Sequence, residues 1–301
     1  MTNKYKVAIL GYGEMGHAMQ HLLSENHECS LWDKYPVDGL KVQPLQDIIP
    51  LADFILFCLP VNPHREIIQQ IKPLLKSNSI CISIAKGLDE FGQTATQIFE
   101  DGLGEDHFYA LIYGPMISEE IIASRYAFAQ LGCRQTSTCE NTLNLFSQTP
   151  LFLESTDDIT GISWSVILKN VYALLFGMVD ELQLGDNMRG FLVVEALREL
   201  DKIVCEMGGE SGSPYHLAGL GDLITTATSE DSFHHNLGRE LARDDRSNVT
   251  GEGVHTLKMV DKHQLFEKKN YPLFNLIFDI VSHPVNVKNA LLKYITNKYD
   301  S

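Results

Sequence analysis

The chain has 301 residues, of which 44% are hydrophobic and 21% are charged, a composition typical of a globular protein large enough for two domains. The chain has 24 Lys and Arg residues and 39 Asp and Glu residues, so its formal net charge is -15 at pH 7. A surface this acidic repels phosphate backbones and anionic lipid, which argues against nucleic-acid and membrane partners.

The six cysteines are scattered along the chain, at Cys29, Cys58, Cys81, Cys133, Cys139 and Cys205. They form no CxxC pair and no spacing with histidines that suits zinc, so we expect buried free thiols and no metal site. The N-terminal residues MTNKYK lead straight into the apolar run VAIL, and no later apolar run approaches the length of a membrane span. We therefore expect a protein of the reducing cytoplasm, without membrane insertion.

The first half of the chain alternates short apolar runs with helical patterns. The apolar runs are KVAILG, ECSLWD, ADFILFCLP and SICISIA, and the helical patterns cover about Met15 to Leu23 and the segment HREIIQQIKPLL. Such runs between helices are typical of parallel strands that are covered on both faces. The segments FYALIYG, YAFAQLG and PLFLEST extend the same sheet. The sequence therefore predicts an α/β domain with a doubly wound sheet.

The pattern changes near Thr156 to Ile159. Beyond this point apolar residues recur at helical spacing, as in WSVILKNVYALLFGMVDEL and GFLVVEALRELDKIVCEM, and strand-like runs nearly vanish. We predict a sheet domain at residues 1–156 and an all-helical domain at residues 157–301.

A glycine-rich turn follows the first predicted strand. The segment GYGEMG at Gly11–Gly16 comes after an apolar run and opens a helix, which is the setting that a dinucleotide-binding GxGxxG motif requires. Gly11 permits the tight turn, Gly13 lets the backbone approach a pyrophosphate, and Gly16 allows close packing of helix on strand. The remaining loop residues expected to contact the cofactor are Tyr12, Glu14 and Met15. The alternative is a plain strand-to-helix turn.

Asp33 ends the second predicted strand, about 20 residues after the glycines. A carboxylate there can bond the ribose 2′-hydroxyl of a dinucleotide and repels a 2′-phosphate, so Asp33 favours NAD, while its neighbour Lys34 leaves NADP open. Otherwise Asp33 is a solvated surface acid. Pro60 ends the third strand at the carboxyl edge, where ligands of open α/β sheets bind, although a strand terminator explains it equally well. Together these features predict a Rossmann domain.

Lys86 stands directly after the strand SICISIA, at the same carboxyl edge of the sheet. Hydride transfer to a carbonyl carbon leaves negative charge on oxygen, so such a site needs a proton donor and fixed positive charge. A lysine supplies both, and the acidity of the chain makes a local cation more necessary for an anionic substrate. The alternative is a solvated lysine in a loop.

Lys169 and Asn170 lie inside the apolar helical segment WSVILKNVYALLFGM. A lysine is rarely buried unless it has a partner or a task, and burial lowers a lysine pKa toward the range in which a general acid or base works. The alternative is a lysine whose stem packs on the helix while its ammonium reaches water.

Asp222 and Thr226 lie four residues apart in HLAGLGDLITTATS and face one way if a helix starts at Gly221. A carboxylate there can pair with Lys169. The alternative, equally supported by the sequence, is an acid that is favoured by the dipole of the helix N-terminus.

These segments resemble those of the NAD(P)-dependent glycerol-3-phosphate dehydrogenases along nearly the full chain. The matching segments are GYGEMG, AKGLDE, GPMISEE, VILKNVYALLFGMVDELQLGDN, LAGLGDLITTATS and GEGVHT. The LKN, AGLGDL and EGVHT runs, in this order, are far more specific than a glycine loop. The resemblance implies an N-terminal Rossmann domain and an all-α C-terminal domain of the 6-phosphogluconate dehydrogenase C-terminal-like type, which carries the catalytic and substrate-binding residues.

The resemblance also implies an activity. It implies hydride transfer between NAD(P)H and dihydroxyacetone phosphate or glycerol 3-phosphate, with a role in glycerol-3-phosphate metabolism and phospholipid biosynthesis in the cytoplasm. Lys169 is then the proton-transfer residue and Lys86 a cation near cofactor and substrate. The neighbours implied for the substrate are Asn170, Asp222 and Thr226, and those implied for the cofactor are Gly114, Met116, Ser118 and Glu252. No metal is expected, because lysine takes the place of a Lewis acid. The oligomeric state stays open, with a homodimer among the alternatives.

One departure from the family pattern affects the substrate. Relatives carry a Ser-Arg-Asn triplet whose arginine and asparagine bind the substrate phosphate, whereas this chain has Ser232, Phe233 and His234. Loss of a charged hydrogen bond costs roughly 1.5–3 kcal/mol, which is on the order of 10 to 100-fold in binding. His234, His235 or Arg239 can compensate; otherwise the substrate is a non-phosphorylated hydroxy or keto compound. A third alternative is an inactive dinucleotide-binding sensor.

Overall fold

The computed structural model describes residues 4–36, 38–104, 107–229 and 232–300. The chain divides into two compact units. The sheet unit comprises Met1–Asp89 and Gln93–Ile159, and the helical unit comprises Glu90–Gly92 and Thr160–Ser301. The three residues Glu90–Gly92 follow the fourth strand in sequence, yet they pack within the helical unit: Lys262 Nζ and His263 Nε2 lie 3.1 and 2.9 Å from the Glu90 carbonyl oxygen.

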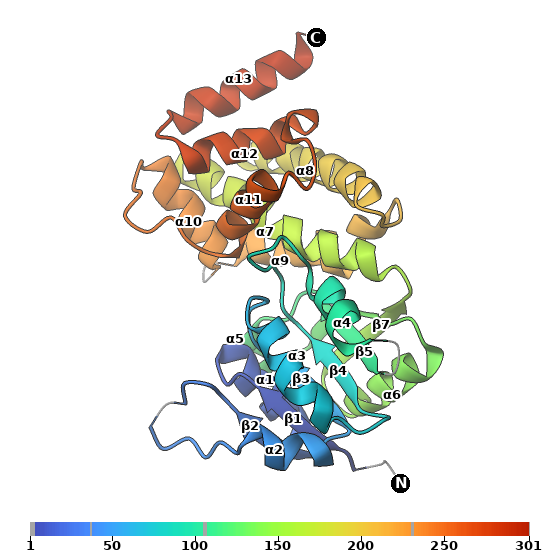
Figure 1. Ribbon diagram of the computed structural model, residues 1–301. Coiled ribbons are helices and arrows are strands. Elements are labelled where there is room, and N and C mark those ends of the chain that lie inside the picture. The colour runs from blue at the N-terminus through green and yellow to red at the C-terminus, as the bar shows by residue number, and fades with distance from the viewer. Residues whose placement is uncertain (1–3, 37, 105–106, 230–231, 301) are drawn as a thin grey trace. The chain divides into compact units, whose positions relative to one another are not determined.

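The sheet unit alternates strands and helices, as the apolar pattern predicts (Figure 1). Its strands are β1 (Lys6–Leu10), β2 (Glu28–Trp32), β3 (Phe54–Phe57), β4 (Ile80–Ser83), β5 (Phe108–Tyr113), β6 (Ala127–Gly132) and β7 (Leu151–Thr156). Its helices are α1 (Glu14–Leu23), α2 (Leu45–Ile48), α3 (His64–Ile71), α4 (Ala95–Leu103), α5 (Ser118–Ile122) and α6 (Thr136–Phe146).

The seven strands form one sheet in the order β2-β1-β3-β4-β5-β6-β7. β1 to β5 are parallel, which confirms the predicted Rossmann arrangement, and the three additional segments do extend the sheet. The last two strands depart from this parallel arrangement: β6 is antiparallel to β5, and β7 is parallel to β6. The connection from β5 to β6 holds only the five-residue α5, so the chain turns back near the edge where β5 ends.

Both faces of the sheet are covered by helices, which is why its strands are apolar on both sides. Val7 and Ile9 of β1 belong to one buried cluster together with Met19 of α1, Ile121 of α5 and Phe146 of α6. On the opposite face, aromatic rings of β3, α4 and β5 pack together. The ring centroid of Phe99 lies 5.1 Å from that of Phe57 and 5.6 Å from that of Tyr109. The sheet is therefore packed on both of its faces.

His64 begins α3 and is completely buried. Its Nδ1 lies 2.9 Å from the carbonyl oxygen of Pro60 and its Nε2 lies 2.9 Å from Oγ of Ser83. In the neutral ring one nitrogen donates to the carbonyl while the other accepts from the serine. Burial lowers the pKa of His64 to about 4, although the hydrogen bond to Pro60 opposes the shift.

We expect His64 to make the protein sensitive to acid. In the unfolded chain His64 takes up a proton at its ordinary pKa of 6.5, whereas in the folded chain it does so only at about 4. The free energy of unfolding therefore decreases as the pH falls from 6.5 to about 4, by about 3 kcal/mol at most. Unfolding midpoints of the wild type and His64→Gln, measured by circular dichroism from pH 7 to pH 4, should converge as the pH falls. His283→Gln, at an exposed position, is the matched control. Parallel curves for wild type and His64→Gln would refute this expectation.

The helical unit contains no β-strand among its described residues, in agreement with the periodicity of its sequence. Its α-helices are α7 (Ile159–Glu181), α8 (Asp186–Glu206), α9 (Asp222–Thr228), α10 (Phe233–Ala242), α11 (Glu252–His263), α12 (Pro272–Ser282) and α13 (Val287–Tyr299).

The expectation that no apolar run reaches membrane-spanning length is wrong for α7. Among the described residues, this 23-residue helix alone has the length and the mean hydropathy, 1.5, to cross a bilayer. Its most apolar window is, however, completely buried within the protein, and a buried core helix meets the same criteria as a membrane span. The apolar composition of α7 therefore agrees with its burial inside the protein.

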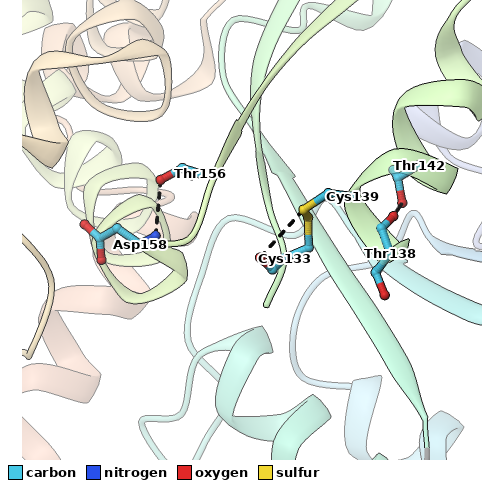
Figure 2. Close-up of a disulfide and its surroundings, with 6 residues drawn as sticks. All are labelled: Cys133, Thr138, Cys139, Thr142, Thr156 and Asp158. Atoms are coloured by element: carbon cyan, nitrogen blue, oxygen red, sulfur yellow. Dashed lines mark hydrogen bonds between the residues drawn. A yellow bond between two sulfur atoms is a disulfide. The ribbon is translucent and has the colours of Figure 1, made fainter. Parts of the chain in front are cut away.

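Two cysteines depart from the expectation of free thiols. Cys133 follows β6, Cys139 lies on α6, and the two form a disulfide (Figure 2). The short connection between strand and helix brings their Cα atoms to 5.8 Å, within the range that a disulfide requires. Cys81 is a buried free thiol as expected, whereas Cys205 is exposed because it lies on the outer side of α8. Burial raises the pKa of Cys29 to about 11 and that of Cys58 to about 12.

Candidate active site

The glycine-rich turn has the backbone geometry that dinucleotide binding requires. Gly11 has φ +91°, and a Cβ on it would lie 2.7 Å from the carbonyl oxygen of Cys58. A Cβ on Gly16 would lie 2.2 Å from the carbonyl oxygen of Gly11, so only glycine lets α1 start this close to the turn. A Cβ on Gly13 would meet no atom within 4 Å, so its backbone faces open space at the start of α1. The turn therefore fits a pyrophosphate at a helix N-terminus.

Asp33 is held firmly at the end of β2. Its two carboxylate oxygens accept hydrogen bonds from the backbone N–H groups of Tyr12 and Tyr35, both at 2.7 Å. Each oxygen has a second lone pair with which it can accept a ribose hydroxyl. Lys34, the residue that leaves NADP open, lies with its Nζ 3.2 Å from Oε1 of Glu66. This pairing reduces the positive charge that a 2′-phosphate would meet.

The other loop residues of the motif differ in their surroundings. The ring of Tyr12 stacks on that of His17 with a centroid separation of 3.8 Å, and its hydroxyl contacts Gln20. Glu14 is exposed in the first turn of α1, and Met15 packs in part against the core of the sheet unit.

Lys86 lies beyond the end of β4 and is half-buried. Its Nζ donates a hydrogen bond of 3.1 Å to the carbonyl oxygen of Gly114, just after β5. Gly114 is needed there because a Cβ would lie 2.5 Å from the carbonyl oxygen of Phe128. Pro60 is exposed beyond the end of β3. These residues therefore all follow the carboxyl ends of parallel strands.

Met116 and Ser118 have less freedom to meet a cofactor than the resemblance implies. Met116 is 5% exposed and belongs to the buried cluster of the sheet unit. Ser118 begins α5, is 6% exposed, and lies with its Oγ 2.9 Å from Oε2 of Glu119.

In the helical unit, Lys169 is buried in the middle of α7 with a carboxylate and a hydroxyl beside it. The side chains of Lys169 and Asp222 are 6% and 5% exposed, and Lys169 Nζ lies 3.2 Å from Asp222 Oδ2. Lys169 Nζ also donates to Thr226 Oγ1 at 2.7 Å. The pairing expected from the sequence is present, and a buried charge pair of this kind is held in one geometry by its hydrogen bonds.

The local fold around Asp222 fixes these partners. A π-helical turn, Leu217–Gly221, leads directly into α9, so that Asp222 is the first residue of the helix and Thr226 lies one turn later on the same face. The Thr226 hydroxyl donates to the Asp222 carbonyl oxygen at 2.7 Å, which leaves its lone pairs facing the Lys169 ammonium. Asp222 is thus both an acid at a helix N-terminus and a partner of Lys169. π-Helical turns inside α-helices occur frequently at functional sites.

Asn170 follows Lys169 and connects α7 to α11. Its Nδ2 donates to Oε2 of Glu252, the first residue of α11, at 3.0 Å. Asn170 is buried at 2% exposure. The structure thus joins five of the candidate residues, Lys169, Asn170, Asp222, Thr226 and Glu252, through direct contacts or adjacency in α7.

The residues that replace the phosphate-binding pair of the family pattern contact the glycines on either side of Glu252. A Cβ on Gly251, which has φ +109°, would lie 2.5 Å from Cε1 of Phe233, so the ring rests on this glycine. The backbone N–H of Gly253 donates to Nε2 of His234 at 3.2 Å. Ser232 caps α10, since its Oγ accepts from the backbone N–H of His235 at 3.4 Å. Phe233 and His234 therefore support the start of α11.

Two of the three residues named as alternative phosphate anchors, His235 and Arg239, lie beside a carboxylate. His235 Nε2 lies 2.8 Å from Oδ2 of Asp180, and Arg239 Nη2 lies 3.9 Å from the same oxygen. Asp180 also pairs with Arg189. Neither the role of Asp180 nor that of Gly251 and Gly253 was predicted from the sequence. The sequence signal for these contacts was the pair of glycines that flank Glu252 in GEGVHT. Glycine at the start of a helix often marks a place where another segment approaches the backbone closely.

Comparison with known proteins agrees with this arrangement. Residues 36–139 match the family model of the N-terminus of NAD-dependent glycerol-3-phosphate dehydrogenase, and residues 158–292 match the model of its C-terminus. The chain belongs to this family. A relative named glycerol-3-phosphate dehydrogenase [NAD(P)+] from Staphylococcus aureus is 25% identical over 321 aligned positions, which cover 95% of this chain and 96% of the relative.

Solved glycerol-3-phosphate dehydrogenases have the same fold. The enzyme from Coxiella burnetii matches with a TM-score of 0.84 at 23% identity, over 97% of this chain and 99% of that one. The enzyme from Saccharomyces cerevisiae matches with a TM-score of 0.77 at 19% identity, over 97% of this chain and 99% of that one. The chain is thus a glycerol-3-phosphate dehydrogenase-like oxidoreductase that uses NAD(P) and acts on CH–OH groups.

Proposed function

We propose that this chain interconverts glycerol 3-phosphate and dihydroxyacetone phosphate with NAD as the hydride carrier. The observation that carries the proposal is the buried cluster of Lys169, Asp222 and Thr226 in the helical unit. The family supplies the substrate, since the curated relatives are named for glycerol 3-phosphate. The substrate is a small molecule.

In this proposal Lys169 gives a proton to the ketone oxygen on reduction and takes it back on oxidation. The bound dinucleotide supplies or accepts the hydride. Asp222 balances the charge of the Lys169 ammonium group. Thr226 holds this group in place by accepting a hydrogen bond from one of its N–H groups. A fixed cation beside an oxygen that becomes negative lowers the barrier more than a mobile one, because no reorientation is needed during the reaction. The hydrogen bond from Asn170 to Glu252 holds the start of α11 against the middle of α7.

The sheet unit holds the dinucleotide in this proposal. Gly11, Gly13 and Gly16 receive the pyrophosphate, Asp33 receives the ribose hydroxyls, and Lys86 and Gly114 line the carboxyl edge of the sheet. Pro60, Met116 and Ser118 complete the proposed surroundings, although the burial of Met116 and Ser118 limits what their side chains contribute.

The test of the proposal is a steady-state assay of NADH oxidation with dihydroxyacetone phosphate, dihydroxyacetone and a series of keto acids. We expect dihydroxyacetone phosphate to give the highest kcat/KM. A second candidate, a related dehydrogenase for a non-phosphorylated hydroxy or keto substrate, is favoured by the contact of Phe233 with Gly251 and by the pairing of His235 and Arg239 with Asp180. A higher kcat/KM for dihydroxyacetone or for a keto acid would establish this candidate. If no substrate supports NADH oxidation, the alternative of an inactive dinucleotide-binding sensor is favoured.

We expect Asp33 to set the choice of cofactor. The carboxylate repels a 2′-phosphate, and Lys34 is paired with Glu66, so the wild type should use NADH in preference to NADPH. Asp33→Ser should shift the ratio of kcat/KM toward NADPH by about 10-fold, since loss of one repulsion near a surface is worth about 1–2 kcal/mol. Asp38→Ser, a nearby change of the same charge, is the control. Equal use of both cofactors by the wild type would contradict this prediction.

We propose the cytoplasm, where thiols are kept reduced, so Cys133 and Cys139 would be present there as thiols rather than as the disulfide. A homodimer is the assembly that we propose. It is supported by exposed aromatic rings at the β6–β7 end of the sheet, where Tyr126, just before β6, Phe128 of β6 and Phe152 of β7 are 69%, 44% and 53% exposed.

A further inference from the structure

A cavity lies within the helical unit, and its lining is separate from the residues of the candidate active site. Its volume is about 820 Å³, which is within the range of small-molecule binding sites. It is lined by α8, α12 and α13 and by the segments next to α12. None of its lining residues is Lys169, Asn170, Asp222, Thr226 or Glu252. The cavity therefore requires its own explanation.

The face that α13 turns toward this cavity is polar. Its lining residues recur at helical spacing along one side of the helix and are Ala290, Lys293, Tyr294, Asn297 and Lys298. The buried side chains of α13 are Val287 and Leu291. A helix that packs directly on a core presents a broad apolar stripe to it. α13 instead covers a space that it does not fill.

The three carboxylates of the cavity already have partners within the protein. Asp279 Oδ2 accepts a hydrogen bond from Asn275 Nδ2 at 3.2 Å. Glu195 pairs with Arg198 at 2.7 Å and contacts Lys298. Glu199 accepts from the backbone N–H groups of Leu273 and Phe274 at 2.7 and 2.8 Å, where it caps the start of α12. These carboxylates thus have structural roles.

Two of the lysines in the lining differ from these carboxylates in that they have no ion-pair partner among the described residues. In the described part of the chain, no carboxylate lies within ion-pair distance of Lys202 on α8 or Lys293 on α13. The lining has five cationic residues and three carboxylates, whereas the whole chain has a net charge of -15. Positive charge gathered on an acidic protein attracts anions to that place.

The wall of the cavity on α12 is partly apolar, since Leu276 and Ile280 line it together with Asn275 and Asp279. Leu276 and Ile280 lie one turn apart on α12, and Val285 and Ala290 continue the apolar lining toward α13. An occupant that covers these side chains removes apolar surface from water, which contributes about 25 cal/mol for each Å². The cavity thus combines a partly apolar wall with two lysines, Lys202 and Lys293, that are not paired with a carboxylate.

We propose that this cavity binds a soluble amphiphilic anion, an organic phosphate or carboxylate with an apolar body. The acidic head lies toward Lys202 and Lys293, and the apolar body lies on Leu276 and Ile280. The proposal is independent of the dehydrogenase reaction, because the lining shares no residue with the candidate active site.

The experiment is isothermal titration calorimetry of the whole protein with octyl phosphate, inorganic phosphate and octanol. We expect saturable binding of one octyl phosphate per chain, and at least 10-fold weaker binding of the other two, since each lacks one half of the recognised chemistry. The double variant Lys202→Gln with Lys293→Gln should weaken binding of octyl phosphate by roughly 10-fold. Lys288→Gln, on the same helix but outside the cavity, is the matched control and should bind as the wild type does.

A second variant tests the cavity by volume rather than charge. Ala290→Phe places a ring in the cavity from α13 and should abolish binding, while its circular dichroism spectrum and unfolding midpoint show whether the helix still packs. Absence of saturable binding to the wild type would overturn the proposal. So would equal affinity for octanol, equal weakening by Lys288→Gln, or capture of the protein by phosphatidic acid vesicles without binding of octyl phosphate.

Discussion

Replacement of Lys169 by methionine is expected to lower turnover by ~10²–10⁴-fold, the usual effect of losing a general acid–base group. Methionine has nearly the length of the lysine stem, so the packing of α7 is kept while the ammonium is lost. The dissociation constant for NADH should change little, because the dinucleotide is held by the sheet unit in the proposed function. Steady-state kinetics and fluorescence titration with NADH measure the two effects separately.

The variant also leaves Asp222 buried without its cation, which destabilises a protein by about 3–5 kcal/mol when the charge is not relieved. The double variant Lys169→Met with Asp222→Asn removes both charges and should recover part of the lost stability without recovering turnover. Lys258→Met, at an exposed position of α11, is the control for loss of a lysine from the same unit. Turnover retained by Lys169→Met would exclude this lysine as the proton donor.

Replacement of Phe233 by arginine is expected to raise kcat/KM for dihydroxyacetone phosphate by roughly 10 to 100-fold. Phe233 lies on Gly251, next to Glu252, which is bonded to Asn170 beside Lys169. A guanidinium placed here would present two parallel N–H groups to a phosphate, which an aromatic ring cannot do. His234 should be kept, because its Nε2 accepts the hydrogen bond from the N–H of Gly253.

Two comparisons make this prediction specific. Phe233→Leu removes the ring without adding charge and should leave kcat/KM for dihydroxyacetone phosphate unimproved. For dihydroxyacetone, which has no phosphate, Phe233→Arg should give no gain. If the wild type already reduces dihydroxyacetone phosphate efficiently and Phe233→Arg brings no improvement, another cation holds the phosphate, and the prediction is wrong.

Features that depend on local sequence were predictable. Gly11 and Gly16 of GYGEMG are required by one turn, and the strands beside them are apolar because helices cover both faces. The spacing of Asp222 and Thr226 fixes their common face once the start of α9 is known. Burial of Lys169 followed from the apolar residues on every side of it in α7.

Features that depend on how distant segments meet were not predictable. Alternation of side chains is the same in both directions of a strand, so the reversal of β6 and β7 leaves no mark in the pattern. The pairing of Cys133 with Cys139 depends on the path of one short loop. The contacts of Phe233 and His234 with the two glycines beside Glu252 join segments that no periodicity connects.

The loop Glu90–Gly92 has a consequence for any attempt to separate the two units. The chain passes from the sheet unit into the helical unit at this loop, returns, and passes over again after Ile159. A fragment that ends at Ile159 retains the loop but loses the α11 residues that bind it. A fragment that starts at Thr160 leaves Lys262 and His263 without their carbonyl partner. Chimaeras with relatives should therefore transfer these three residues together with the helical unit, as an insertion rather than as a simple fusion.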